Sequence, residues 1–177
     1  MHRSSSCFGR MFRRFKHVTL YPVPRSGECE SPSFIMIRKA TTEDQSRITE
    51  VRSAVRENRL SPSNVSRVSD TARWIYEHGT FWVWEQDGAV QGFAVADVRD
   101  GTIFGLFVHP DYEGRGIARA LLPLACEDLR LAGYTVARLT TDPGTRAERF
   151  YRRNGWTDTG RREKGEIVFE RTLKHGG

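Results

Sequence analysis

The sequence predicts one domain of the α/β or α+β class, in which helices are layered on a sheet. Its 177 residues suit a single compact domain. From Met36 onward, strand-like and helix-like stretches alternate, which favours a layered fold over a β-sandwich or a helix bundle. The hydrophobic share of 38%, with 10 Phe and 4 Trp, can fill one core, so the chain as a whole is not expected to be disordered.

Residues 1–35 differ from the rest of the chain in composition. They carry six Arg or Lys side chains against two Glu, are rich in serine and are interrupted by Pro22, Pro24 and Pro32. Because such a segment is poorly suited to fill a core, we expect 1–35 to be a poorly ordered basic extension and 36–177 to form the domain. Three origins of the extension stay open: a start placed too far upstream, a genuine basic tail, and a targeting peptide.

Two helices are predicted in the first half of the domain. Thr42-Glu43-Asp44-Gln45 fits a capping box, and the helix after it is expected to run to about Arg56. The buried face of this helix is expected to carry Ile48, Val51, Ala54 and Val55. A second helix is expected to end near Gly79 as its C-cap, with Trp74 and Ile75 facing inward.

Four strands are predicted in the stretch that ends at residue 108. The first is short, at 35–38. Residues 81–84 and 90–98 read as two antiparallel strands joined by a tight turn at Asp87-Gly88. The strand at 102–108 is nearly all apolar, so we expect it in the middle of a sheet with both faces covered.

A long helix is predicted after this apolar strand. It is expected over 117–132, closed by Gly133, with a kink caused by Pro123. The remaining predicted elements are a strand at 136–141, a helix at 145–153 and a strand pair at 156–159 and 167–172.

A glycine-rich turn, residues 109–116, joins the apolar strand directly to the long helix. Such a turn presents backbone N–H groups at the positive end of the helix, which is a geometry that binds phosphate or pyrophosphate. Arg115 either adds a charged contact to a phosphate or is an exposed arginine on a solvated turn. Two nucleotide fingerprints are excluded, because no Lys-Ser/Thr follows Gly116 and because Arg119 stands at the third glycine position of the dinucleotide motif.

Two stretches of the sequence are similar to known motifs. The stretch Glu113-Gly114-Arg115-Gly116-Ile117-Ala118 is similar to the motif Gln/Arg-x-x-Gly-x-Gly/Ala, with Glu113 in place of Gln or Arg. The stretch from Gly144 to Trp156 is similar to Asn-x-x-Ala-x-x-Phe-Tyr-x-x-x-Gly-Phe, with Gly144 in place of Asn. In both motifs the chain resembles the GNAT superfamily of acyl-CoA-dependent N-acyltransferases. Each motif lies on the predicted type of element, and the resemblance covers about residues 36–172.

The resemblance implies a mixed, mostly antiparallel sheet flanked by helices, and an enzyme that uses acetyl-CoA as the acyl donor without a metal. It implies that the strand before the turn splays from its neighbour and that the cofactor contacts are Leu106, Phe107, Val108, Glu113, Gly114, Arg115, Gly116, Ile117 and Ala118. It also implies that Tyr151 protonates the departing CoA thiolate, although a tyrosine that only packs beside Phe150 is the alternative. The predicted reaction is direct transfer of an acetyl group to a primary amine.

No residue stands out as the general base that would deprotonate the acceptor ammonium. Some enzymes of the superfamily carry a glutamate on the strand before the turn, but residues 102–107 contain no carboxylate. The remaining candidates, acting directly or through a water, are Glu85, Asp97, Asp100 and His109.

In the superfamily, acceptor specificity comes from the segment after the first helix and from the sheet face opposite the cofactor. Here this implies Arg56, Glu57, Arg59, Trp82 and Trp84 as acceptor contacts. A glutamate for the amine and an arginine for a carboxylate would suit a small zwitterion, such as an amino acid or its analogue. Alternatively, the charges belong to a solvated helix end and the two tryptophans fill the core.

Other function classes are open. The net charge of +6 and an arginine cluster favour a nucleic-acid-binding module, but glutamates interleave with the cluster, so nucleic acid is an unlikely partner. The cluster consists of Arg146, Arg149, Arg152, Arg153, Arg161 and Arg162. A protein or peptide amine acetyltransferase and a non-catalytic CoA-binding module are further alternatives.

Cellular context is read from the cysteines and from hydropathy. No stretch approaches the roughly 20 apolar residues of a membrane-spanning helix, which excludes an integral membrane protein of that kind. Cys7, Cys29 and Cys126 form no paired motif, so a reducing, cytoplasmic compartment is expected. A homodimer is the default expectation for the oligomeric state.

Overall fold

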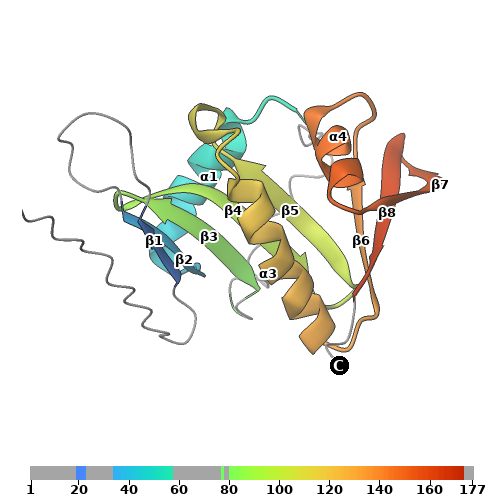
Figure 1. The fold of residues 1–177 in the computed structure, drawn as a ribbon, viewed down its shortest axis with the longest axis horizontal. Coiled ribbons are helices and arrows are strands. Elements are labelled where there is room, and N and C mark those ends of the chain that lie inside the picture. Colours follow the sequence, from blue (N-terminus) through green and yellow to red (C-terminus); the bar gives the residue numbers. More distant parts are fainter. Residues whose placement is uncertain (1–18, 23–33, 58–76, 78–79, 174–177) are drawn as a thin grey trace, which may run out of the picture.

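A computed structural model of the chain describes residues 19–22, 34–57, 77 and 80–173. Within these residues eight strands form one sheet in the order β1-β2-β3-β4-β5-β6-β8-β7 (Figure 1). The strands are β1 Thr19–Pro22, β2 Phe34–Lys39, β3 Phe81–Gln86, β4 Ala89–Asp97, β5 Thr102–Val108, β6 Val136–Thr141, β7 Thr157–Glu163 and β8 Glu166–Thr172. The helices are α1 Gln45–Ala54, α3 Ile117–Leu131 and α4 Arg146–Arg153.

Neighbouring strands pair antiparallel throughout this sheet, except for β5 and β6, which are parallel. The connection between β5 and β6 contains α3, as expected for a crossover between parallel strands. The predicted fold class, a mixed and mostly antiparallel sheet flanked by helices, is therefore confirmed.

Two cores lie on opposite faces of the sheet, because strand side chains alternate between the faces. On β3, Val83 belongs to the core that α1 covers through Val51. Its neighbour Trp82 belongs to the larger core, to which α3 contributes Leu121 and α4 contributes Tyr151. The sheet thus separates α1 from α3 and α4.

The predicted β3–β4 hairpin is confirmed. Asp87 and Gly88 form its two-residue turn with φ angles of 54° and 77°, the left-handed pair that matches the twist of a hairpin. The first predicted strand is present as β2, and it begins at Phe34, two residues before the proposed domain start. The strand β1 lies within residues 1–35, where no strand is predicted, and it pairs with β2. The boundary at residue 36 stays a prediction.

Three local expectations are corrected. The capping box is one residue earlier than predicted, because the Thr41 backbone N–H donates to the Asp44 carboxylate at 2.7 Å. The helix α1 ends at Ala54 rather than near Arg56, since Val55 is extended. Both faces of β5 were expected to be covered, but Phe104 is 38% exposed.

The second half of the chain follows the prediction closely. The helix α3 runs through Pro123 as one helix, as predicted, with the proline on its exposed side, and the kink at Pro123 stays a prediction. The strand β6, the helix α4 and the pair β7–β8 lie where expected. The helix predicted to end near Gly79 lies outside the described residues.

Candidate active site

The site is built where β5 and β6 separate. The two strands meet at Thr102 and Arg138, and the Arg138 N–H donates to the Gly101 carbonyl at 3.1 Å. This is the one β5–β6 residue pair in the described sheet, and Figure 1 shows the strands diverging from it. Beyond this point the backbone edge of β5 that faces β6 is open. The splay implied by the family resemblance is thus present in the fold.

The turn after β5 leaves its backbone accessible. Gly114 and Gly116 have φ angles of 74° and 82°, which favour glycine. A Cβ added to either residue would meet no other described atom within 4 Å, so the space above the turn is open. Gly116 is the N-cap of α3 and has no side chain to occupy the first-turn N–H groups. Ile117 and Ala118 therefore begin a helix whose positive end can accept an anion.

Arg115 is folded back onto this turn. Its guanidinium donates to the Asp111 carbonyl at 3.1 Å and lies 4.6 Å from the centroid of the Tyr112 ring. The backbone of Arg115 belongs to the glycine turn, while its side chain packs on Asp111 and Tyr112, which precede that turn's glycines. The sequence alone left both roles of this side chain open.

A glycine that the sequence reading missed sets the height of α3 above the sheet. A Cβ at Gly92 would lie 2.7 Å from the Ile117 side chain and 3.1 Å from the Phe107 carbonyl oxygen. Gly92 pairs with Val108 across β4 and β5, directly below the start of α3. The signal in the sequence is an isolated glycine within an apolar strand, which marks a close backbone approach.

The predicted pantetheine contacts form the last residues of β5. Leu106, Phe107 and Val108 are half-buried and pair with β4 on one edge. Leu106 and Val108 pack against the core of α3, whereas Phe107 packs on the opposite face beside Phe93, with ring centroids 5.2 Å apart. Their backbone groups on the other edge face the splay and can bind an extended ligand.

Tyr151 projects from α4 into the larger core. It is 7% exposed and its ring packs edge-on against Phe150 and Trp156, at centroid distances of 5.4 and 5.8 Å. Burial raises the pKa of Tyr151 above its ordinary range, and the nearby Cys126 thiol adds a smaller effect in the same direction. Burial also raises the pKa of Cys126, to about 11. The Tyr151 hydroxyl therefore remains protonated at neutral pH.

An ion-pair bridge spans the two helix starts at the site. The guanidinium of Arg146, the first residue of α4, contacts the Glu113 carboxylate of the glycine turn. The Arg146 backbone N–H donates to the Glu57 carboxylate at 3.0 Å, and the Arg146 side chain lies 3.9 Å from the same carboxylate. Glu113 and Glu57 were singled out separately in the sequence, but Arg146 was assigned only to the arginine cluster.

The four base candidates are dispersed. Glu85 is ion-paired to Arg38 at 2.7 Å. Asp97 and Asp100 flank the turn between β4 and β5, at the closed end of the splay, and the pKa of Asp97 is lowered because hydrogen bonds from Arg99 outweigh the opposing effect of burial. His109 alone of the four directly follows β5, at the open end. Its Nδ1 accepts from the Asp111 N–H at 3.4 Å and lies 3.7 Å from the Asp111 carboxylate.

The predicted acceptor contacts are also divided by the fold. Trp82 and Trp84 are buried in the core beneath α3, where the Trp82 indole N–H donates to Asp128 at 2.8 Å. This is the core role that the sequence left open for them. Arg56 is exposed after α1, and Arg59 lies outside the described residues. Glu57 is engaged by Arg146, as described above.

Arg52, which the sequence reading did not single out, lies beside the end of β5. It lies in the last turn of α1, and its guanidinium carbon is 4.2 Å from the centroid of the Phe107 ring. Burial lowers the pKa of Arg52. Because α1 covers the face opposite α3, Arg52 lies across the sheet from the glycine turn and beside the last residues of β5. Its position depends on a helix–strand contact that local patterns do not reveal.

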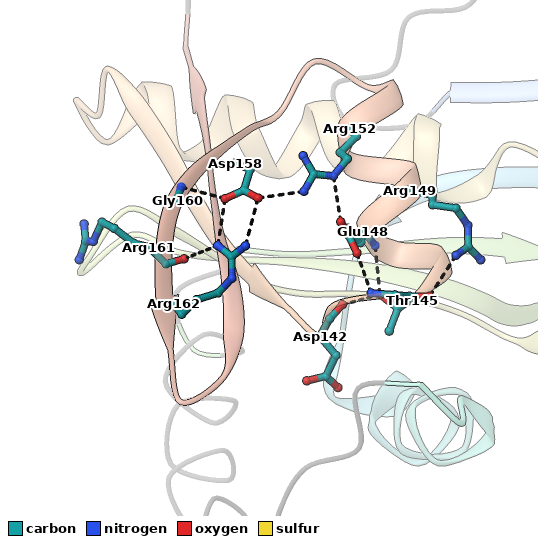
Figure 2. Close-up of polar contacts among 10 residues, drawn as sticks. Asp142, Thr145, Glu148, Arg149, Arg152, Asp158, Gly160, Arg161 and Arg162 are labelled. Carbon is teal, nitrogen blue, oxygen red and sulfur yellow. Dashed lines mark hydrogen bonds and ion pairs between the residues drawn. The ribbon is translucent and has the colours of Figure 1, made fainter.

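The arginine cluster on α4 and β7 is largely neutralised by carboxylates (Figure 2). Asp158 accepts from Arg152 at 2.8 Å, from Arg162 at 3.1 Å and from the Gly160 N–H at 2.8 Å. These contacts lower the pKa of Asp158 to about 2, the largest cause being the Gly160 N–H. Four of the six clustered arginines are ion-paired in this way, namely Arg146, Arg152, Arg161 and Arg162.

The rest of the described structure holds a cavity away from the splay and no grouping of metal-ligating side chains. A cavity of about 600 Å³ lies between the C-terminal half of α3 and the end of β8, lined by Cys126 and Arg171 among others, and it includes none of the predicted cofactor residues. Within the described ranges, no three His, Cys, Asp or Glu side chains are grouped so that they could hold a metal ion. None of the helices that the structure describes combines the length and apolar character needed to span a bilayer.

Comparison with known proteins identifies the family. The model of the acetyltransferase (GNAT) family matches residues 46–156, so the chain belongs to this family. It is a GNAT-type N-acetyltransferase, and the family uses acetyl-CoA as the donor and an amine as the acceptor. A search of curated protein sequences found no match.

Solved structures share the fold at low sequence identity. The PaiA N-acetyltransferase of Thermoplasma acidophilum, solved with coenzyme A, is 19% identical with a TM-score of 0.61, over 78% of this chain and 99% of that chain. The ribosomal-protein-S18-alanine N-acetyltransferase of Escherichia coli is 20% identical with a TM-score of 0.62, over 81% and 96%. N-acetylglutamate synthase of Neisseria gonorrhoeae is 17% identical with a TM-score of 0.61, over 80% of this chain and 36% of that chain.

Proposed function

We propose that the protein transfers the acetyl group of acetyl-CoA directly to the primary amine of a small molecule that also carries a carboxylate, such as an amino acid or its analogue. One observation carries the proposal: the open edge of β5 lies between the uncapped start of α3 and the helix that bears Tyr151, with Arg52 on the opposite face. The proposal thus places donor and acceptor on opposite sides of one strand.

The donor fits the residues at the splay. The pyrophosphate is assigned to the first-turn N–H groups of Ile117 and Ala118, because Gly116 leaves them accessible and its missing Cβ leaves room for a ligand. The pantetheine arm is assigned to the backbone edge of Leu106, Phe107 and Val108 that faces β6. Acetyl-CoA supplies the thioester, and the chain supplies positioning and proton transfer.

The proton transfers are assigned to two side chains. The amine nitrogen attacks the thioester carbonyl carbon, the carbon–sulfur bond breaks, and the thiolate must gain a proton while the nitrogen loses one. A backbone N–H near Val108 polarises the carbonyl, and Tyr151 donates to the sulfur. His109 is assigned as the base, acting through a water, because it follows β5 at the open end and its Nδ1 lies 3.7 Å from the Asp111 carboxylate, which can orient the imidazole.

Arg52 supports an acceptor with a carboxylate. A guanidinium that is partly withdrawn from water gains from an anionic ligand and can bind a carboxylate through two parallel hydrogen bonds. Its contact with the Phe107 ring holds it beside the strand where the thioester is expected. A carboxylate bound there would orient the amine of the same molecule toward the splay.

The first test is calorimetric titration of acetyl-CoA into the full chain, with ATP and NAD as controls. Saturable binding of acetyl-CoA alone is expected, and no binding would contradict the assigned donor site.

The second test compares each amino acid with its amide as acceptor. We expect the acids to be preferred, and Arg52→Gln to lower kcat/KM for the acid by roughly 10- to 100-fold while leaving the amide unchanged. Equal use of acids and amides would contradict the carboxylate assignment. The control Arg130→Gln changes an exposed ion pair at the far end of α3.

A further inference from the structure

The open end of the splay, where Glu113 of the glycine turn faces Arg146 at the start of α4, is its mouth. The charges at the mouth depart from the family motif. The family places Gln or Arg at the position of Glu113, just before the glycines of the turn. Here a carboxylate stands at that position, beside the positive end of α3. A negative charge there repels the phosphate groups that this helix end would otherwise attract. The arrangement therefore calls for a compensating cation.

Arg146 is that cation. It comes from the start of α4, on the other side of the splay, and its guanidinium contacts the Glu113 carboxylate. Glu57 holds the same residue from the segment after α1, through the Arg146 backbone N–H at 3.0 Å. Three segments that are far apart in the sequence thus meet at Arg146 and fix its place at the mouth.

We propose that Arg146 binds the pyrophosphate of the donor from the α4 side, and that Glu113 is a positioning residue that holds Arg146 ready for it. The positive charge that an arginine at this motif position would carry on the turn is, in this chain, supplied across the splay. The inference rests on the proposed function, since it concerns the same donor site.

The ion pair between Arg146 and Glu113 is exposed enough for Arg146 to exchange the carboxylate for the pyrophosphate. The Arg146 side chain is 59% exposed and the Glu113 side chain 29% exposed, so their ion pair is weakened by solvent and can be broken. A guanidinium binds two phosphate oxygens in parallel, which is a stronger interaction than an exposed ion pair with one carboxylate. Arg115, the alternative cation, is folded onto Tyr112 and the Asp111 carbonyl instead.

The test measures acetyl-CoA affinity of the full chain by calorimetry in matched variants. Arg146→Gln should weaken binding by roughly 10- to 100-fold, the loss expected for one charge-assisted contact. Glu113→Gln should weaken it by a smaller factor, about 2- to 5-fold, because the exposed ion pair that holds Arg146 in place is lost. The double variant Glu113→Arg with Arg146→Gln returns the charge to the position of the family motif and should restore much of the affinity. A purely structural role of Arg146 does not predict this rescue.

A truncated donor separates pyrophosphate binding from a general defect. S-acetyl-pantetheine lacks the pyrophosphate, so Arg146→Gln should leave kcat/KM with this donor unchanged. The inference alone is overturned if Arg146→Gln binds acetyl-CoA as the wild type does, if it loses both donors equally, or if the double variant shows no rescue. Absence of acetyl-CoA binding by the wild type would instead overturn the proposed function, and this inference with it. Arg130→Gln again serves as the control and should bind as the wild type does.

Discussion

The two helices at the mouth of the splay begin in opposite ways. The helix α4 is capped by side chains: the Thr145 hydroxyl accepts from the Glu148 N–H at 3.1 Å, and the Gly144 N–H donates to the Glu148 carboxylate at 2.7 Å (Figure 2). The Arg146 N–H donates to the Glu57 carboxylate. The helix α3 begins at Gly116, which offers no side chain to its first turn.

This difference separates a helix start that the protein satisfies with its own side chains from one that is open to a ligand. A helix start leaves four backbone N–H groups without intrahelical partners, and a protein stabilises them with its own side chains or leaves them for a ligand. The structure has the first arrangement on α4, and we propose the second for α3. The predictions below test this contrast, in order of decreasing effect.

The largest effect is expected at the open helix start. Gly116→Val should abolish acetyl-CoA binding, because the new side chain occupies the space above the turn and the φ of 82° strains any residue with a Cβ. Gly133→Val is the matched control, since Gly133 follows the other end of α3 with a φ of 95° and equally open surroundings. Calorimetry should find binding lost in the first variant and kept in the second. Loss in both would assign the effect to backbone strain.

The next effect concerns chemistry between the two helices. Tyr151→Phe should keep acetyl-CoA binding and lower kcat by roughly 100-fold, because the thiolate loses its proton donor. The substitution retains the ring contacts with Phe150 and Trp156, so the stability of the protein should change little. Steady-state rates and acetyl-CoA titration on the same preparation check both parts. An unchanged kcat would remove Tyr151 from the mechanism.

A smaller effect is expected at the capped helix start. Thr145→Ala removes the hydroxyl that accepts from the Glu148 N–H and should lower the free energy of unfolding by about 1 kcal/mol. Acetyl-CoA affinity should stay within about twofold, since this helix end is satisfied by the protein itself. Urea unfolding and calorimetry together measure the contrast. A large loss of affinity without loss of stability would show that α4, too, offers its start to the ligand.

The smallest effect is expected in the dependence of kcat on pH, which should reach a plateau at alkaline pH. The reaction needs Tyr151 protonated, and burial raises its pKa, so ionisation of this group is delayed to higher pH than in an exposed tyrosine. The kcat should therefore rise as the amine acceptor loses its proton and then stay level up to about pH 10, the ordinary tyrosine pKa. A decline of kcat between about pH 8 and 9, in a protein that remains folded, would contradict the assignment of Tyr151 as the donor.

The local elements were accessible from the sequence because their signals are local. The hairpin at Asp87-Gly88 follows from left-handed turn residues between two apolar runs. The helix α3 follows from its apolar period and from the closing glycine. The glycine turn predicts an anion site, because the residue types and their order are enough to infer accessible backbone N–H groups. Errors at this level were small, such as the capping box that is shifted by one residue to Thr41 and Asp44.

Contacts between distant segments were not accessible. The family resemblance implied that Trp82 and Trp84 contact the acceptor, but the alternation of side chains along β3 places both in the core beneath α3. Glu57 looked like a free carboxylate at a helix end, and only the approach of α4 shows that it binds Arg146. Gly92 and Arg52 were missed because their roles depend on Ile117 and Phe107, residues on other elements.

The sequence by itself therefore determined the elements, the family and the open helix start at Gly116. Tertiary structure decided which face each tryptophan occupies, where β5 and β6 separate, and how Glu57, Arg146 and Glu113 meet. The physical reason is the range of the interactions: turn conformations, capping and periodicity act within a few residues, whereas burial and ion pairing depend on segments that only the folded sheet brings together.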